Sequence, residues 1–295
     1  MAKYLTPAVT PICNDKIDYN SLKKLYDHLI CGGVDGILVL GSIGEFFSFS
    51  FEEKKELIKF AHEYINGRTE LIVGTTSMVI DEIIELSNYA LSLGVKSVMI
   101  IPPYYFHYTK ESIFSYYSNL ARKINGDIYL YNFPDRTGYE IEVETIKKLV
   151  QAHKNIIGIK DTISGVTHTK EIIKQVKKIN PNFIVYSGFD DNFVANVMCG
   201  GDGCIAGLSN LYPKLTSSWV KAVNNNDFSK ASLIQRKIDK LMDIYSVGKP
   251  FVPYIKQCLK IKGIINSSEA KHPMPVTNKE EIGKLIAIMK EYENE

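Results

Sequence analysis

Residues 127–160 read DIYLYNFPDRTGYEIEVETIKKLVQAHKNIIGIK. Two short apolar runs, DIYLY and IIGIK, enclose residues 142–151, where apolar side chains recur at helical spacing. Both runs are apolar on both faces, which is typical of strands in a parallel sheet covered by helices. The segment therefore predicts one strand–helix–strand unit.

The same unit recurs along most of the chain. Eight apolar runs follow one another at a mean spacing of about 28 residues, which is enough for a strand, a helix and two loops. The runs are LTPAV from Leu5, GILVL from Gly36, LIVG from Leu71, SVMII from Ser97, DIYLY from Asp127, IIGIK from Ile156, FIVYS from Phe183 and GCIAG from Gly203. Eight such units favour an α/β fold, a closed (β/α)₈ TIM barrel. The alternative is an open doubly wound sheet, although no GxGxxG string follows the first run.

Helical patterns fill the gaps between the runs. Ser50-Phe51-Glu52-Glu53 has the pattern of a capping box, which predicts a helix start. Further helices are expected at residues 80–93, 112–124, 142–151, 167–180 and 213–224. After Asn224 the strand pattern stops, and residues 228–246, 253–262 and 279–292 predict three more helices. We expect residues 1–225 to form the catalytic barrel and residues 226–295 a C-terminal helical extension packed on it.

Composition limits the classes of function. The 295 residues carry 35 basic and 33 acidic side chains, a net charge of +2 that gives no footprint for nucleic acid or an anionic membrane. No apolar run is long enough to span a membrane. The five cysteines form no CxxC pair, and an odd, sparse set is typical of reduced thiols in the cytoplasm. The six histidines form no metal-binding motif, so no metal and no cofactor is expected.

Several polar residues fall at the C-terminal ends of the predicted strands, where barrel enzymes keep their active sites. Lys160 ends IIGIK, and burial there would favour the neutral amine that attacks a ketone to form a Schiff base. Tyr131 ends DIYLY and can move a proton over the barrel mouth. Taken alone, each residue also fits a structural role: a lysine that reaches solvent, or a tyrosine packed in the top layer of the barrel.

Other strand-end strings are open to both readings. Gly41-Ser42-Ile43-Gly44-Glu45 offers a hydroxyl and successive backbone N–H groups for a carboxylate, or it is an ordinary turn. Pro102-Pro103-Tyr104-Tyr105-Phe106 fits either a pocket or loop packing. Asp190 and Asp191, after Gly188, either accept hydrogen bonds from sugar hydroxyls or cap the next helix.

In their joint order these strings resemble the superfamily of dihydrodipicolinate synthase and N-acetylneuraminate lyase, from the first strand to at least Lys262. The resemblance implies a (β/α)₈ lyase that binds pyruvate or a 2-keto acid as a Schiff base. It implies that Lys160 is the Schiff-base lysine, that Tyr131 is the catalytic tyrosine, and that Ser42 is the first hydroxyl of the carboxylate-binding string. It also implies that Tyr105 reaches into the site of a neighbouring subunit, in a homotetramer built from two dimers.

GSIGEF, YNFP, IIGIKDTI and GFDD look most like the 2-keto-3-deoxy-gluconate (or galactonate) aldolases of this superfamily. Ile43 stands where the synthases and lyases have a threonine. Arg136 matches the arginine with which the synthases hold the carboxylate of their second substrate, or it forms a structural ion pair with Asp135 or Glu140. Ile205, at the last strand end, completes the expected substrate-binding set with Ile43, Arg136, Gly188, Asp190 and Asp191.

The resemblance thus implies a class I aldolase that reversibly cleaves a 2-keto-3-deoxy sugar acid to pyruvate and an aldehyde such as glyceraldehyde. The first alternative is 4-hydroxy-tetrahydrodipicolinate synthesis from pyruvate and aspartate semialdehyde. The remaining alternatives are an N-acetylneuraminate lyase and a catalytically silent barrel that binds sugar acids. The expected partners are small keto acids and aldehydes, with no nucleic acid and no membrane.

Overall fold

Eight parallel strands close into a barrel in the computed structural model, which describes residues 1–293. The order around the barrel is β1-β10-β9-β8-β7-β6-β5-β4, with β1 joined to both β10 and β4. Each of the eight apolar runs contributes one strand, so the predicted (β/α)₈ fold is confirmed. The strands are β1 Lys3–Pro7, β4 Gly36–Val39, β5 Glu70–Gly74, β6 Ser97–Ile100, β7 Asp127–Asn132, β8 Ile156–Asp161, β9 Ile184–Ser187 and β10 Gly203–Ile205.

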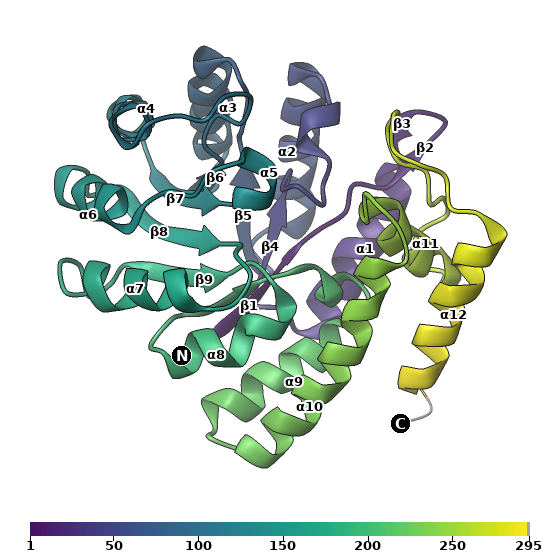
Figure 1. Cartoon of the computed structure of the whole chain (residues 1–295). Helices are drawn as coiled ribbons and strands as arrows, with labels where there is room; N and C mark the ends of the chain where they lie inside the picture. The colour runs from purple at the N-terminus through teal and green to yellow at the C-terminus, as the bar shows by residue number, and fades with distance from the viewer. Residues whose placement is uncertain (294–295) are drawn as a thin grey trace.

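Helices cover the outside of the barrel, as Figure 1 shows. They are α1 Tyr19–Gly32, α2 Phe51–Ile65, α3 Ile80–Ser92, α4 Lys110–Lys123, α6 Val143–Ala152, α7 Thr167–Val176, α8 Phe193–Met198 and α9 Pro213–Asn224. The capping box at Ser50 forms as predicted, with both reciprocal hydrogen bonds present. The sequence patterns did not predict α1, α8, the single-turn helix α5 (Pro134–Thr137) or the small hairpin of β2 (Ile12–Cys13) and β3 (Lys16–Ile17).

The pairing of β7 with β8 places the central residues of the site. After a register shift between Ile128 and Tyr129, Tyr131 lies opposite Lys160 and Asn132 lies opposite Asp161. Successive side chains on a strand point to opposite faces. Tyr131 and Lys160 therefore face the interior of the barrel mouth together, while Asn132 and Asp161 face the surrounding helices together.

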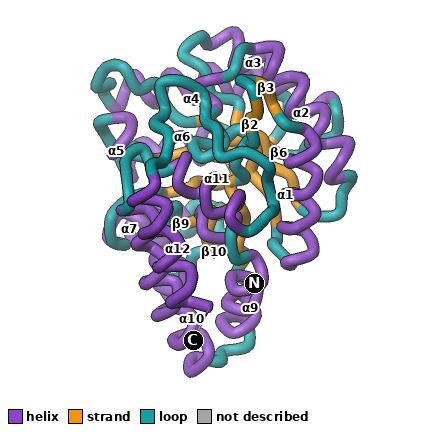
Figure 2. The backbone as a smooth tube through the Cα atoms, turned by 90° about the vertical axis from the view of Figure 1, so that its right-hand side faces the viewer, coloured by secondary structure: helices purple, strands orange, loops and turns teal. Residues whose placement is uncertain are grey.

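Three further helices follow the barrel: α10 Phe228–Leu241, α11 Val252–Ile261 and α12 Lys279–Glu293. A 3₁₀ turn at Met242–Ser246 joins the first of them to the loop before α11. Helix α10 packs on α9, and α12 packs on both α10 and α11 on one side of the barrel (Figure 2). The predicted C-terminal helices are confirmed, whereas the division at residue 225 stays a prediction. None of the helices within residues 1–293 has the length and apolar character to cross a membrane.

Candidate active site

Three side chains from three strand ends form a continuous polar chain. The Lys160 amine lies 3.3 Å from the Tyr131 hydroxyl, which lies 3.3 Å from the Ser42 hydroxyl. The amine also lies 4.5 Å from the centre of the Tyr131 ring. Only 4% of the Lys160 surface and 5% of the Tyr131 surface reach solvent. The arrangement places an amine, a phenol and an alcohol within proton-transfer reach in a largely desolvated setting.

A cavity of about 560 Å³ opens above this chain. Its volume suits a small organic ligand, and most of its wall is apolar with a few converging polar groups. Six of the predicted substrate-site residues lie in the wall beside Lys160 and Tyr131: Ser42, Ile43, Arg136, Gly188, Asp190 and Ile205. The C-terminal segment supplies a further part of the wall through Met242, Tyr245, Lys249, Pro250 and Phe251.

A buried ion pair fixes the loop that carries Ser42. Glu45 adopts a left-handed backbone conformation (φ 57°), and its carboxylate pairs with Lys256 of α11, with both side chains fully buried. The Lys256 amine also donates to the Glu269 carbonyl at 2.9 Å, and the Lys271 N–H donates to the Glu45 carboxylate at 2.9 Å. Burial lowers the pKa of Lys256, and the Glu45 carboxylate opposes that shift. The loop is thereby attached to the C-terminal segment through a charge pair that water does not reach.

Asp190 lies in the cavity wall, but its carboxylate is already occupied. It accepts hydrogen bonds from the Tyr4 hydroxyl, from the Tyr245 hydroxyl at 2.8 Å and from the Leu208 N–H at 2.9 Å. Burial raises the pKa of the Asp190 carboxyl, against the effect of these three donors. The network ties β1, the turn after β9 and the C-terminal segment together under the floor of the cavity. Contact between Asp190 and sugar hydroxyls stays a prediction.

Thr162 was not among the predicted site residues, yet it lines the cavity two positions after Lys160. Its hydroxyl is buried and has no hydrogen-bond partner within the protein. Gly188 leaves the room for it, because a Cβ on Gly188 would lie 1.9 Å from the Thr162 hydroxyl oxygen. A buried hydroxyl without a partner is costly, so Thr162 is a strong candidate for contacting a bound ligand.

Arg136 lines both the main cavity and an adjoining apolar cavity of about 330 Å³. Its guanidinium lies over the Phe133 ring, 5.3 Å from the ring centre. Among residues 1–293 it forms no ion pair with Asp135, Glu140 or any other carboxylate. The structural ion pair considered from the sequence is therefore wrong, and the planar fork of donors is free to bind a ligand.

Two predicted residues lie outside the cavity. Tyr105 is 78% exposed on the loop after β6, where its ring packs edge-on against Phe106. Asp191 is exposed at the start of the turn after β9. In the described chain, no group of three or more histidine, cysteine, aspartate or glutamate side chains could hold a metal ion.

The residues that sequence reasoning missed come mainly from beyond the barrel. Tyr245 and Phe251 pack edge-on against each other in the cavity wall, 5.0 Å between ring centres. No local pattern marks them as site residues, because the turn that carries them is placed by helix packing. Thr162 could have been predicted from the sequence. It lies two positions after Lys160, and alternate residues of a strand point to the same face.

A buried lysine beside a tyrosine at the mouth of a (β/α)₈ barrel is an arrangement suited to Schiff-base lyases. Residues 1–292 match the model of the Dihydrodipicolinate synthetase family. The chain belongs to this family. It is a lyase of the class I, pyruvate-dependent aldolase type, in which a lysine forms the Schiff base, and the resemblance drawn from the sequence is confirmed.

Relatives described as aldolases and relatives described as synthases are both similar to the chain. A probable 2-dehydro-3-deoxy-D-pentonate aldolase, YjhH of Escherichia coli, is 34% identical over 84% of this chain and 82% of its own length. The crystal structure of the E. coli prophage protein YagE in complex with pyruvate matches with a TM-score of 0.96 and 31% identity, covering 99% of this chain and 98% of YagE. A 4-hydroxy-tetrahydrodipicolinate synthase of Hydrogenobaculum is 31% identical over 98% of this chain and 97% of its own length.

Proposed function

We propose that this protein reversibly cleaves a 2-keto-3-deoxy sugar acid to pyruvate and an aldehyde such as glyceraldehyde. The observation that carries the proposal is the buried chain Lys160–Tyr131–Ser42, with both steps at 3.3 Å, at the floor of the main cavity. The similarity to YjhH, described as a probable pentonate aldolase, supports the sugar-acid class of substrate.

The reaction begins when the Lys160 amine attacks C2 of the keto acid. The resulting carbinolamine loses water to give an iminium ion, with Tyr131 protonating the departing hydroxyl. Tyr131 then accepts the proton of the C4 hydroxyl. The electrons of the C3–C4 bond move toward the iminium nitrogen, which releases the aldehyde and leaves an enamine. Protonation at C3 and addition of water return pyruvate and the free amine.

The rest of the site holds the substrate during these steps. We assign the Ser42 hydroxyl and the Ile43 N–H to the carboxylate of the keto acid, because both residues line the cavity. Thr162 has a free buried hydroxyl in the same cavity, and we assign it to a hydroxyl of the sugar chain. Ser42 also connects Tyr131 to the carboxylate side of the pocket, which gives the proton a path between the two.

Borohydride trapping tests the assigned lysine. Incubation of the protein with pyruvate and borohydride should add one reduced pyruvyl group to Lys160, which peptide mass spectrometry locates. Lys160→Met is the matched variant, and it should give no adduct and no turnover. An adduct on another lysine, or full activity in the variant, removes this assignment.

A panel of substrates tests the branch of the family. Pyruvate release is measured from gluconate-type, galactonate-type and pentonate-type 2-keto-3-deoxy acids and from sialic acid. We expect the sugar acids to give the higher kcat/KM. Turnover of sialic acid alone would refute the proposed substrate class.

The second candidate is 4-hydroxy-tetrahydrodipicolinate synthesis, and the free guanidinium of Arg136 in the cavity wall favours it. It shares the enamine half of the reaction and differs in the aldehyde that the enamine attacks. Arg136→Ala should abolish turnover of aspartate semialdehyde if that reaction is native. It should leave sugar-acid cleavage mostly intact if the aldolase proposal is right.

We further propose a homotetramer, a dimer of dimers, in which Tyr105 of one copy completes the site of another. Tyr105 and Phe106 are exposed on the loop after β6, and Tyr104 of the same loop lines the adjoining cavity beside Ser42. Sedimentation velocity tests the assembly. Activity recovered by mixing Tyr105→Ala subunits with Lys160→Met subunits tests the shared site.

A further inference from the structure

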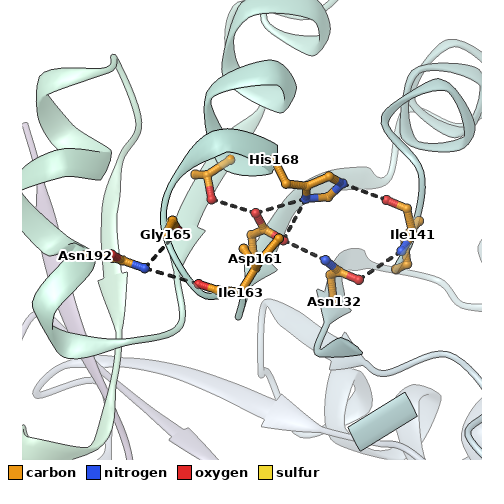
Figure 3. A network of polar contacts seen from close by, with 8 residues as sticks. Asn132, Ile141, Asp161, Ile163, Gly165, His168 and Asn192 are labelled. Atoms are coloured by element: carbon orange, nitrogen blue, oxygen red, sulfur yellow. Dashed lines mark hydrogen bonds and ion pairs between the residues drawn. The ribbon is translucent and has the colours of Figure 1, made fainter. Parts of the chain in front are cut away.

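A polar network joins Asn132, Asp161, His168 and the Ile141 carbonyl (Figure 3). By strand alternation, Asn132 and Asp161 point to the face opposite Tyr131 and Lys160. Asn132 and Asp161 are the outward-facing neighbours of Tyr131 and Lys160, and they are joined across β7 and β8 by a 2.7 Å hydrogen bond. The Thr169 hydroxyl donates to the same carboxylate at 2.6 Å. Each residue that faces the cavity is thus backed by a neighbour that is fixed on the opposite face.

His168 of α7 completes the network, and its two ring nitrogens face only acceptors. Nδ1 lies 3.1 Å from each oxygen of Asp161, and Nε2 lies 3.1 Å from the Ile141 carbonyl oxygen. A carbonyl oxygen cannot donate, so Nε2 must carry a proton. Each Asp161 oxygen already accepts one hydrogen bond, from the Asn132 amide or the Thr169 hydroxyl, and Nδ1 lies equally close to both oxygens, so the geometry favours a proton on Nδ1 as well.

The charged groups around His168 agree with this assignment. Asp161 faces it from β8, and Glu140 acts on it from the segment before α6. Burial would lower the pKa of His168, but the hydrogen bond and the charge of Asp161 outweigh burial and raise it. Both side chains are buried, so salt screens their attraction weakly.

We propose that Asp161 and His168 form a buried carboxylate–imidazolium pair that positions Lys160 relative to Tyr131. The inference rests on the catalytic roles proposed above for Lys160 and Tyr131. The pair anchors the end of β8 to α7, and the Asn132 amide extends the anchor to the end of β7. Lys160 directly precedes Asp161, and Tyr131 directly precedes Asn132. The network therefore sets the separation between the amine and the hydroxyl across which the proton moves.

A positioning role predicts a split between kinetic constants. The carboxylate of the keto acid is held by Ser42 and Ile43, on another strand end, whereas proton transfer depends on the Lys160–Tyr131 separation. His168→Gln should therefore lower kcat by about 10-fold to 100-fold and leave KM nearly unchanged. The matched control is His28→Gln, because His28 also lies against a backbone carbonyl, that of Asn210 at 3.2 Å, but on α1. The control should keep the kcat of the unsubstituted enzyme.

Nuclear magnetic resonance of histidine labelled with ¹⁵N in its ring tests the charge state without relying on activity. At roughly pH 7.5, where a free histidine is mostly neutral, His168 should give the signals of an imidazolium. Those signals should disappear in His168→Gln, and in Asp161→Asn the ring should become neutral. The Asp161→Asn spectrum remains informative even if that variant is inactive.

Three outcomes overturn the inference. One is a neutral His168 ring at that pH, and another is an unchanged kcat in His168→Gln. Borohydride trapping with pyruvate, applied to the unsubstituted enzyme and to His168→Gln, separates failure of the positioning role from failure of the proposed function. An adduct on Lys160 in both proteins, with equal kcat, removes only the positioning role. An absence of adduct in both proteins removes the proposed function and the positioning role with it.

Discussion

Replacing Lys256 by methionine tests how strongly the loop that carries Ser42 depends on the C-terminal segment. Methionine has nearly the length of lysine, so the change removes the charge and its hydrogen bonds and leaves little empty space. It leaves Glu45 fully buried with no cation beside it. The Lys271 N–H is then the main remaining donor to the Glu45 carboxylate. The variant therefore measures the cost of an uncompensated buried charge next to the site.

The magnitude follows from the burial of both partners. Removing one member of a buried ion pair costs about 3–5 kcal/mol of unfolding free energy. A chain of 295 residues has an unfolding entropy of about 0.6 kcal/mol/K, so this loss lowers the Tm by roughly 5–8 °C. Glu45→Gln in the same chain removes the stranded charge, and the double variant should recover most of the loss.

Thermal unfolding followed by circular dichroism provides the measurement, and the KM for the keto acid is determined on the same samples. KM should rise in Lys256→Met, because the freed loop holds Ser42 less firmly. Lys284→Met is the control: its 2.7 Å pair with Glu280 is exposed, so its Tm should shift by no more than about 1–2 °C. An unchanged Tm in Lys256→Met, or an equal loss in the control, would refute the reasoning.

Three further predictions concern the same end of the barrel. Burial would lower the pKa of His168, yet its carboxylate partner raises it above 6.5; the stabilisation from this pair is complete below pH 6.5 and is lost as pH rises through the raised pKa. Urea unfolding at pH 6 and pH 9 should show a larger drop for the wild type than for His168→Gln. Tyr131→Phe should lower kcat by about 10²–10⁴-fold while the protein stays folded, as pre-steady-state trapping and circular dichroism would report. Gly188→Ala should destabilise the fold by about 1–3 kcal/mol in denaturant unfolding, because the new Cβ would overlap Thr162; an unchanged midpoint would contradict the close approach.

The strands of this fold are predictable because each is a short apolar run buried on both faces. The burial pattern of β4, buried at all four positions, is the pattern expected from GILV. Helix α1 was equally readable: Leu22, Leu25 and Leu29 are buried at helical spacing behind an Asp18 cap, although it was not among the expected helices. Helix α8 is only six residues long and carries too little periodicity to be recognised.

The site residues also differ in how far they could be predicted. Lys160 and Tyr131 were predictable because parallel strands bring their C-terminal ends to one edge, and the register of β7 and β8 makes them direct neighbours. The occupied state of Asp190 was not predictable, since its donors Tyr4 and Tyr245 lie 186 and 55 residues away along the chain. Contacts of that kind depend on how helices pack, which a local pattern does not encode.

The buried pair of Glu45 and Lys256 also bears on when the protein becomes active during its synthesis. Glu45 is added to the nascent chain 211 residues before Lys256, a delay of about 10–40 s at common rates of translation. Through that interval the nascent chain carries an unpartnered acidic group at the mouth of an unclosed barrel, because β1 still lacks β10 for most of it. Firm attachment of the Ser42 loop therefore waits for the translation of Lys256, and a chain truncated before that residue carries Lys160 but lacks the cation that pairs with Glu45.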